Sequence, residues 1–391
     1  MKLTCKACGN EGIDVFFELK NVPVQSVLNI ATRKNAFSYP TGKIALGFCN
    51  ECGFISNTAF EPDLLEYDTG YEATQSYSET FSEFARKQAQ QLIERHDLHG
   101  KELLEIGCGN GEFLTLLCEM GENRGVGFDP AYVDGRVRSD KNAVVNFVKD
   151  YYSEKYSSYQ ADFLYCKMTL EHIPDASNFI GMVRRAIGRL NGTAVFFQVP
   201  DVTRILKDCA FEDIYYEHCS YFSPGSLARL FRRNGFEVLE LETDYAGQYV
   251  MIDAKPEKKV TGRLLPEEND LAMLRNLVAG FTDKLKAKTS WWQKRIGGLR
   301  SEGKKAVIWG SGSKGVSFLT TIGVTDEIQY AVDINPFRQG SFMAGSGHEI
   351  VSPEFMKEYR PDVVIVMNAV YKEEISRDLA AMNLNPDILS L

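Results

Sequence analysis

The 391-residue sequence predicts an α/β protein with two doubly wound lobes and a small module at its N-terminus. Two glycine-rich turns predict the lobes, because each follows a short apolar strand and opens a helical pattern; they lie at Gly107–Gly111 and Gly310–Gly315. Two Cys-x-x-Cys pairs within the first 52 residues predict the module. With 44% hydrophobic and 25% charged residues, the composition is that of a globular protein.

The N-terminal module is expected to contain zinc. Each Cys-x-x-Cys pair precedes a glycine, which eases the turn that directs backbone N–H groups at sulfur. A redox-active pair is the alternative for either pair alone, but two pairs around a short segment favour a metal. Four thiolates leave no open position on the metal, so this zinc should be structural. The predicted ligands are Cys5, Cys8, Cys49 and Cys52.

The first lobe should begin with an amphipathic helix from about Thr74 to His96, where apolar residues recur at helical spacing. Strands and helices then alternate as far as Val250–Ile252, which predicts a mostly parallel sheet covered on both faces. The first strand ends at Glu105 and enters the turn at Gly107–Gly111. Positive φ at glycine lets a ligand approach the backbone, and the helix that follows offers free N–H groups. A tight turn that binds no ligand also requires glycine, so the turn alone is weak evidence for a ligand.

Acidic residues at the ends of the next strands add to this evidence. Asp129 ends the strand Gly125–Phe128, where doubly wound folds place an acid for ribose hydroxyls. Together with Glu105, the E-x-G-x-G-x-G spacing resembles motif I of the class I methyltransferases that use S-adenosylmethionine (SAM). The resemblance implies that the residues after the third strand meet adenine and that Thr169–Asp175 closes over the methionine part of SAM. The implied cofactor-binding residues are Glu105, Gly107, Gly109, Gly111, Asp129, Asp150 and Tyr151.

The second lobe follows a charged stretch and one long helix expected from about Pro266 to Arg300. Its turn is a literal G-x-G-x-x-G, and the strand Tyr330–Val332 ends in Asp333, where NAD-binding folds place their ribose acid. No Tyr-x-x-x-Lys or comparable hydride-transfer grouping accompanies it. Lys314 at the helix start suits an anion, so we expect this turn to hold the acceptor's phosphate or nucleotide part, with NAD as the alternative.

The order of these parts resembles the nucleotide-sugar C-methyltransferases that act on dTDP-4-keto-deoxyhexoses, over essentially the whole chain. The most specific element is Asp213–Ser223, similar to the family's I-Y-x-E-H-x-S-Y-F-S signature, and Asp333–Gly340 is similar to a D-x-N-P-x-K-Q-G run. The resemblance implies a zinc-binding domain at 1–73, a class I SAM-dependent methyltransferase domain at 74–255, a linker helix at 256–303 and a C-terminal Rossmann-like α/β domain at 304–391. SAM would lie in the middle domain, with the nucleotide-sugar between domains.

The sequence also departs from this family. Val22–Ser26 replaces a P-L-A-N run, and Tyr67–Ser76 replaces a tyrosine- and serine-rich segment over the active site. Both segments face the substrate in the family, so the resemblance supports the reaction type more strongly than the identity of the acceptor. The implied substrate-binding residues are Tyr71, Tyr77, Tyr221, Lys314 and Asp333.

Methylation of carbon requires a base that removes a proton beside a carbonyl group, and histidine suits this task near neutral pH. Two of the five histidines match the family's active-site histidines. We expect His218 to be the base and His172 to orient the substrate or stabilise the oxyanion, with Tyr215 and Glu217 completing a hydrogen-bonded pocket. The alternatives are a structural His218 bonded to a carbonyl group and a His172 that shapes its loop. The other histidines, His96, His99 and His348, are expected at the surface or at helix ends.

The expected function is thus SAM-dependent C-methylation of a keto-sugar nucleotide through an enolate. An O- or N-methyltransferase on the same scaffold is the alternative, and an NAD- or nucleotide-binding protein is a third. The formal net charge of −9 argues against nucleic acid as a substrate. No run of about eighteen uncharged apolar residues appears, and the N-terminus lacks the apolar core of a signal peptide, so we expect a cytoplasmic protein without membrane contact.

Overall fold

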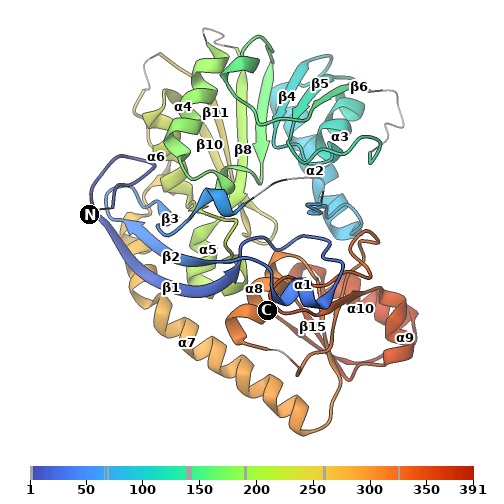
Figure 1. Ribbon diagram of the computed structural model, residues 1–391. Coiled ribbons are helices and arrows are strands. Elements are labelled where there is room, and N and C mark those ends of the chain that lie inside the picture. Colours follow the sequence, from blue (N-terminus) through green and yellow to red (C-terminus); the bar gives the residue numbers. More distant parts are fainter. Residues whose placement is uncertain are drawn as a thin grey trace.

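The computed structural model describes residues 3–65, 67, 70–137, 143–188, 192–258, 261–324 and 326–391. They form an N-terminal sheet, a large central sheet and a C-terminal sheet (Figure 1). In Figure 1 the N-terminal strands run below the central sheet, and the C-terminal sheet lies at the lower right. The predicted fold class, an α/β protein with a small N-terminal module, a doubly wound central domain and a C-terminal α/β domain, is confirmed.

The N-terminal sheet contains a strand from the predicted catalytic segment. Its order is β1-β2-β3-β9, and all pairs are antiparallel. Strand β9 lies about 160 residues beyond β3, yet Tyr221 pairs with Ile55 and Ser220 with Ser56. The module is therefore joined to the segment that carries His218. The elements are β1 (Ile13–Pro23), α1 (Arg33–Phe37), β2 (Thr41–Cys49), β3 (Ile55–Asn57) and β9 (Ser220–Tyr221).

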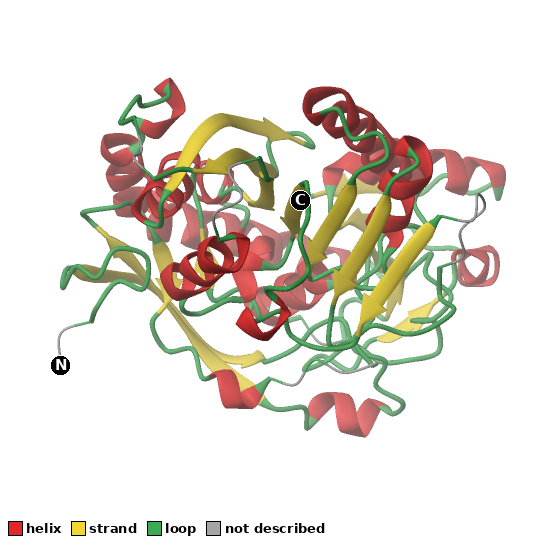
Figure 2. Cartoon of the chain, turned by 90° about the horizontal axis from the view of Figure 1, so that it is seen from above, coloured by secondary structure: helices red, strands yellow, loops and turns green. Residues whose placement is uncertain are grey.

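The central sheet has the order β10-β11-β8-β7-β4-β5-β6, in which β11 alone runs antiparallel to its neighbours. Figure 2, a view from above, shows helices on either side of the strands. The chain order reverses at β4, between β5 and β7, which is where doubly wound folds bind ligands at the carboxyl ends of strands. Helices α2 and α3 pack on one face, and α4 and α6 on the other. The strands are β4 (Glu102–Ile106), β5 (Arg124–Phe128), β6 (Val144–Val148), β7 (Phe163–Lys167), β8 (Ala194–Pro200), β10 (Phe236–Asp244) and β11 (Tyr249–Pro256).

The helices of this part are α2 (Glu79–His96), α3 (Glu112–Gly121), α4 (Ala176–Ile187), α5 (Val202–Asp208) and α6 (Pro224–Arg233). Helix α2 begins five residues later than predicted, because the Ser78 side chain caps it by accepting a hydrogen bond from the Phe81 amide. The same hydroxyl donates to Glu374 in the C-terminal domain. The preceding residues are thereby left to line the cavity described below.

The C-terminal sheet is fully parallel, with the order β14-β13-β12-β15-β16. Its elements are β12 (Ala306–Trp309), α8 (Ser313–Ile322), β13 (Tyr330–Val332), β14 (Glu349–Val351), α9 (Met356–Tyr359), β15 (Val363–Val366), α10 (Lys372–Ala381) and β16 (Asp387–Ser390). Short 3₁₀ turns are η1 (Pro62–Leu64), η2 (Glu154–Tyr156), η3 (Leu170–His172), η4 (Phe211–Asp213), η5 (Pro266–Glu268), η6 (Pro353–Phe355) and η7 (Ala369–Tyr371).

The long helix α7 (Leu271–Ser301) is part of a shared core. It starts after Asp270, five residues later than predicted, and Pro266–Glu268 forms the separate turn η5. Its buried residues, including Phe281 and Trp292, belong to one cluster with Tyr216 of the catalytic segment and Phe318 of α8. This cluster also contains residues of β1 and β2, so the N-terminal module, α7 and the C-terminal domain share one core.

The expectation for the remaining histidines was wrong for His348, which is only 3% exposed. Its Nε2 lies 2.9 Å from the Ile328 carbonyl oxygen, so this histidine ties the loop before β14 to the loop before β13. His96 is also largely buried, and its Nε2 lies 2.7 Å from an Asp253 carboxylate oxygen. His99 is exposed, as predicted.

In the part of the chain that the structure describes, we find no helix with the length and hydrophobicity needed to span a lipid bilayer.

Candidate active site

A cavity of about 940 Å³ lies between the three sheets, where the carboxyl ends of β4, β5 and β7 face the second glycine turn. Most of the predicted site residues line it, and Gly111, Glu217 and Tyr221 do not. The predicted residues in its wall are Tyr71, Tyr77, Glu105, Gly107, Gly109, Asp129, Asp150, Tyr151, His172, Tyr215, His218, Lys314 and Asp333. One cavity therefore joins both glycine turns and the predicted histidines.

The first glycine turn is open toward this cavity. A side chain on Gly109 would meet nothing within 4 Å, and Gly109 has a φ of 54°. Asp129 accepts hydrogen bonds from the amides of Gly109 and Ala131, both at 2.8 Å. Gly111 has another purpose, because a Cβ there would lie 2.2 Å from the Phe147 ring. Packing alone thus requires glycine at position 111, and a ligand contact of Gly111 stays a prediction.

An acidic group, Glu105, and a basic group, Lys167, lie below this turn and interact electrostatically. Tyr165 donates a 3.0 Å hydrogen bond to Glu105, and burial raises the pKa of Glu105 to about 8. Lys167 ends β7, donates a 2.5 Å hydrogen bond to Gln88 and lies 3.2 Å above the centre of the Phe113 ring. Burial lowers the pKa of Lys167 to about 7, and it makes no ion pair with a carboxylate of any described residue. The sequence analysis missed Lys167, although a lysine at the end of an apolar strand was a visible signal.

Asp150 and Tyr151 lie at the far side of the cavity, after β6. The carboxylate of Asp150 accepts a 2.6 Å hydrogen bond from Tyr156 and pairs with Lys155, which holds its pKa below the ordinary value. Tyr151 is 60% exposed. The two residues therefore form an open edge where an aromatic ring could lie.

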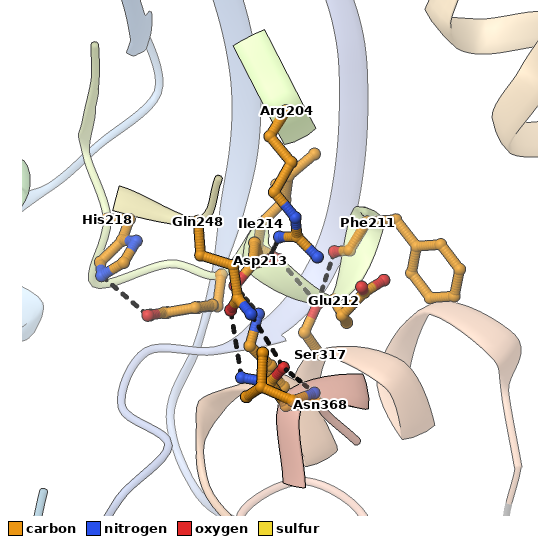
Figure 3. A network of polar contacts seen from close by, with 12 residues as sticks. Arg204, Phe211, Glu212, Asp213, Ile214, His218, Gln248, Ser317 and Asn368 are labelled. Carbon is orange, nitrogen blue, oxygen red and sulfur yellow. Dashed lines mark hydrogen bonds and ion pairs between the residues drawn. The ribbon is translucent and has the colours of Figure 1, made fainter. Parts of the chain in front are cut away.

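His218 is held in a rigid segment. The Cys219 amide donates to the Glu171 carbonyl oxygen at 3.0 Å, and the Asn57 amide donates to the Cys219 carbonyl oxygen at 2.9 Å. The Nε2 atom of His218 lies 2.8 Å from the Tyr215 hydroxyl (Figure 3). Burial holds the pKa of His218 well below its ordinary value and that of Tyr215 well above, so a neutral imidazole and a neutral phenol share one hydrogen bond.

Tyr221 was predicted to bind substrate, and its position contradicts this. It is 2% exposed, lies in β9 and directs its hydroxyl to the Tyr215 carbonyl oxygen at 3.5 Å. Because β9 must pair with β3, the Tyr221 ring packs into the shared core instead of the cavity. Its role is to support the loop that carries Tyr215 and His218.

His172 and Glu171 enter the cavity from η3, opposite His218. The rings of His172 and His218 are 4.9 Å apart and nearly perpendicular. Nδ1 of His172 lies 2.9 Å from the Tyr67 hydroxyl, and burial lowers the pKa of His172 to about 4. This fits a positioning role for His172. Glu171 was not singled out from the sequence, and no periodicity marks it as buried. Of the segment Tyr67–Ser76, positions 68 and 69 lie outside the described residues.

Glu217 lies behind the cavity wall and is 1% exposed. It accepts a 2.5 Å hydrogen bond from the Ser26 hydroxyl and another from Tyr71, and burial raises its pKa to about 7. Ser26 comes from the segment Val22–Ser26 of the N-terminal module. Glu217 therefore connects that module to Tyr71 in the cavity wall.

At the second glycine turn, Asp333 and Lys314 already have polar partners within the protein. The Asp333 carboxylate accepts hydrogen bonds from the Ser311 amide at 3.1 Å and from the Ser311 hydroxyl, and it lies 3.7 Å from Nε of the buried Arg338. Lys314 forms an ion pair with Asp213, which also pairs with Arg204 at 2.7 Å (Figure 3).

A further contact between the middle and C-terminal domains lies beside the second turn. The Gln248 and Asn368 amides exchange hydrogen bonds of 3.0 and 3.1 Å (Figure 3). This reciprocal pair fixes the end of β11 against the loop after β15 at the edge of the cavity.

The four cysteines of the N-terminal module converge as predicted. Their sulfur atoms all lie within 4.8 Å of one another, with Cys5 and Cys52 at 3.6 Å and Cys8 and Cys49 at 3.7 Å. Zinc–sulfur bonds of about 2.3 Å at tetrahedral angles place sulfur atoms about 3.8 Å apart. The cluster thus fits a structural zinc ion.

Comparisons with known proteins match both parts of the chain. A family model described as a methyltransferase domain matches residues 77–241, and one described as a C-methyltransferase C-terminal domain matches residues 247–385. The chain is 25% identical over 389 residues to the C-methyltransferase NovU of Streptomyces niveus, which covers 95% of this chain and 90% of that protein.

Solved structures with a similar fold cover less than half of the chain. Magnesium protoporphyrin IX methyltransferase (ChlM) from Synechocystis PCC 6803, with bound SAH, is 15% identical and has a TM-score of 0.36; the match covers 46% of this chain and 84% of that chain. The 1,6-didemethyltoxoflavin-N1-methyltransferase of Burkholderia thailandensis is 18% identical and has a TM-score of 0.33, over 47% of this chain and 84% of that chain. We draw nothing further from such distant likenesses.

Proposed function

Because the chain belongs to the SAM-dependent methyltransferases that carry a C-methyltransferase C-terminal domain, we propose that it methylates the carbon beside the carbonyl group of a keto-sugar nucleotide. The observation that carries this proposal is the position of His218. It is a buried neutral imidazole that lines the same cavity as the first glycine turn.

Bound SAM would supply an electrophilic methyl group on its sulfonium. His218 takes the proton from the acceptor carbon at Nδ1, the ring nitrogen that has no hydrogen-bond partner among the described residues, while its Nε2–H donates to the Tyr215 hydroxyl. Tyr215 keeps its own proton and holds the ring, because burial keeps its pKa well above the ordinary value. His172 orients the acceptor from the opposite wall. The enclosed cavity keeps reactants aligned for in-line transfer.

The cofactor's adenosine part would lie along the first turn. Asp129 is placed at the end of β5 for the ribose hydroxyls, and Asp150 with Tyr151 borders the adenine. Gly109 leaves room for the ligand because nothing lies within 4 Å of the place where its side chain would be.

The amino-acid end of SAM carries one ammonium and one carboxylate, and the wall of the cavity offers a group for each. Glu105 would bind the ammonium, and Lys167 would bind the carboxylate. Among the described cations of the cavity wall, Lys314 pairs with Asp213 and Arg338 lies beside Asp333. Lys167 donates to the neutral Gln88 and interacts electrostatically with Glu105 without forming an ion pair. An anionic ligand group would stabilise this half-buried cation.

The acceptor would lie between the histidines and the second turn. Lys314 and the start of α8 suit the phosphate part, and Tyr77 lies at the rim, 43% exposed. The resemblance of Asp213–Ser223 and Asp333–Gly340 to the nucleotide-sugar enzymes supports this class of acceptor. Asp333 contributes by fixing the shape of the turn through Ser311.

Proton exchange tests the proposal. A dTDP-4-keto-6-deoxyhexose is incubated in deuterated water with the enzyme and S-adenosylhomocysteine (SAH) in place of SAM, and exchange at the carbon beside the ketone is followed by NMR. The wild type should exchange that hydrogen. His218→Ala should lose exchange and slow turnover by roughly 10²–10⁴, since it removes the base, while SAH binds as before.

His172→Ala should slow turnover but keep some exchange, because the base remains. The exposed His99→Ala is the matched control and should behave as the wild type. A new methyl group on oxygen or nitrogen, with no exchange at carbon in any variant, would overturn the carbon assignment and leave SAM binding standing.

A further inference from the structure

Glu171 is a buried carboxylate that no other described residue satisfies. It lies in η3, is 1% exposed, and lines the cavity. Neither of its carboxylate oxygens accepts a hydrogen bond from another described residue. Its only ion-pair contact among the described residues is with His218, whose Nε2 is 3.9 Å from Oε1.

Such a group is expensive to bury as an anion, so its surroundings favour the protonated form. Burial raises the pKa of Glu171 to about 8. No cation opposes this effect, because both neighbouring imidazoles are themselves neutral near pH 7. The titratable groups that surround Glu171 are Tyr67, Cys166, His172, Tyr215, Glu217, His218, Cys219 and Tyr249.

We propose that Glu171 is a catalytic residue whose protonated carboxyl group donates a hydrogen bond to the acceptor's carbonyl oxygen as that oxygen becomes an enolate. Its side chain lies beside the base, so one acceptor can present its C–H bond to His218 and its carbonyl oxygen to Glu171. This inference rests on the proposed carbon methylation.

The step balances without a further reactant. The proton of the acceptor carbon moves to Nδ1 of His218, the C–H electron pair becomes the C=C bond, and the carbonyl π pair moves to oxygen. Glu171 donates its hydrogen bond to that oxygen and keeps its proton. The enolate carbon then takes the methyl group, the electron pair of the broken carbon–sulfur bond stays on sulfur, and the carbonyl group forms again. The proton on His218 leaves to solvent.

The neighbouring polar groups are less suited to this role. His172 has its Nδ1 engaged by Tyr67. Glu217 is engaged by Ser26 and Tyr71 and does not line the cavity. Tyr215 is already hydrogen-bonded to His218. Glu171 therefore remains as the donor that faces the acceptor from the η3 side.

Two substitutions of Glu171 distinguish a role as hydrogen-bond donor from a role as base. In Glu171→Gln the amide still donates, so turnover should stay within about tenfold of the wild type. In Glu171→Leu the donor is lost, and turnover should fall by roughly 10²–10³, as for other oxyanion donors. The wild-type rate should decline as the pH rises through about 8, where Glu171 loses its proton, and Glu171→Gln should lack this decline. SAH affinity, measured by calorimetry, should be unchanged in both variants.

Several outcomes would overturn the inference. Equal large losses in Gln and Leu variants would make Glu171 a base, and full turnover in Glu171→Leu would leave it no catalytic role. Glu171, His172 and His218 each place a potential ligand atom within 4.8 Å of the others, so turnover that requires an added divalent cation would assign them to a metal instead. A methyl group found on oxygen in the wild type would mean that the proposed function itself has failed. The exposed Glu154→Gln serves as control.

Discussion

The two glycine turns of this chain look alike in sequence and differ in structure. Each follows a strand with parallel neighbours on both sides, β4 or β12, and each faces an aspartate at the end of the neighbouring strand, Asp129 or Asp333. At the first turn the aspartate binds only backbone amides, and Gly109 is open to the cavity. At the second turn the Ser311 side chain binds Asp333, and Arg338 lies beside it.

A glycine motif therefore specifies the path of the backbone but does not determine which ligand binds there. In the second turn a Cβ on Gly315 would lie 2.5 Å from the Gly310 carbonyl oxygen, so close packing of strand and helix alone requires glycine there. An acid that is already paired with a buried arginine is poorly placed to bind a ribose. The first turn therefore fits a nucleoside, whereas the second fits, at most, an anionic group near Lys314.

The largest effect is expected from the loss of zinc, because ligand binding at both glycine turns should then weaken together. Ser26 of the N-terminal module contacts Glu217 beside the active site and Ser313 beside the second turn, at 2.5 and 2.7 Å. Cys49→Ser should lower the zinc content from about one per chain and unfold the module, which weakens SAH and acceptor binding in parallel. Metal analysis and calorimetry check this.

The buried Cys118→Ser lies outside the cluster and should keep its zinc. A zinc-free chain with normal fold and activity would show that the four thiolates have another purpose.

A matched pair of substitutions tests the comparison directly. Asp129→Ala should weaken SAH roughly tenfold to a hundredfold, because hydrogen bonds to a charged carboxylate contribute about 1.5–3 kcal/mol. Asp333→Ala should leave SAH affinity unchanged and lower the melting temperature, since Arg338 loses its nearest carboxylate. Titration calorimetry and thermal unfolding of both variants give the result. Equal weakening of SAH binding by both substitutions would show that the two turns do not differ in their ligand.

Local pattern was sufficient to predict the strands beside the two glycine turns, the turns themselves and the cysteine cluster. These features depend on residues close in sequence: alternating strands and helices, glycines at fixed spacing, and paired thiols. The helix starts were less well predicted, because Ser78 caps α2 through a contact that also involves Glu374 of a distant domain.

Burial at the active site could not be predicted in the same way. Glu171 is buried and Lys167 is half-buried because three sheets meet around one cavity, and no local sequence pattern indicates this. Tyr221 was misassigned for a similar reason: a two-residue strand gives no periodic signal, and its partner β3 lies far away in the sequence. Motif resemblance placed His218 and His172 in the cavity but could not tell which of their neighbours lacked partners.

A smaller effect on ligand affinity is expected at Lys167, one of the two lysines in the cavity wall. Lys167→Met should weaken SAH about tenfold while leaving the affinity for 5′-methylthioadenosine within about twofold, because the latter lacks the amino-acid end. Wild-type SAH affinity should also weaken as the pH rises above about 7, where Lys167 loses its proton, and Lys167→Met should not show this dependence. Calorimetry with both ligands checks this.

Arg86→Met is the matched control, since Arg86 also lines the cavity but is exposed. A loss of 5′-methylthioadenosine affinity equal to the loss for SAH would indicate a general disturbance of the first turn.

The smallest expected effect belongs to Lys314 at the second turn. Its ion pair with Asp213 already offsets much of its charge, so an acceptor phosphate gains less from it than SAM gains from Lys167. Lys314→Met should raise the apparent Kd for dTDP by a few-fold, up to about tenfold, and leave SAH affinity unchanged, because Asp213 keeps Arg204 as a partner. Calorimetric titration of both variant and wild type with dTDP, SAH and NAD distinguishes the possibilities. Tight NAD binding without dTDP binding would make the second turn a dinucleotide site after all, and the resemblance between the two motifs would then extend to their ligands.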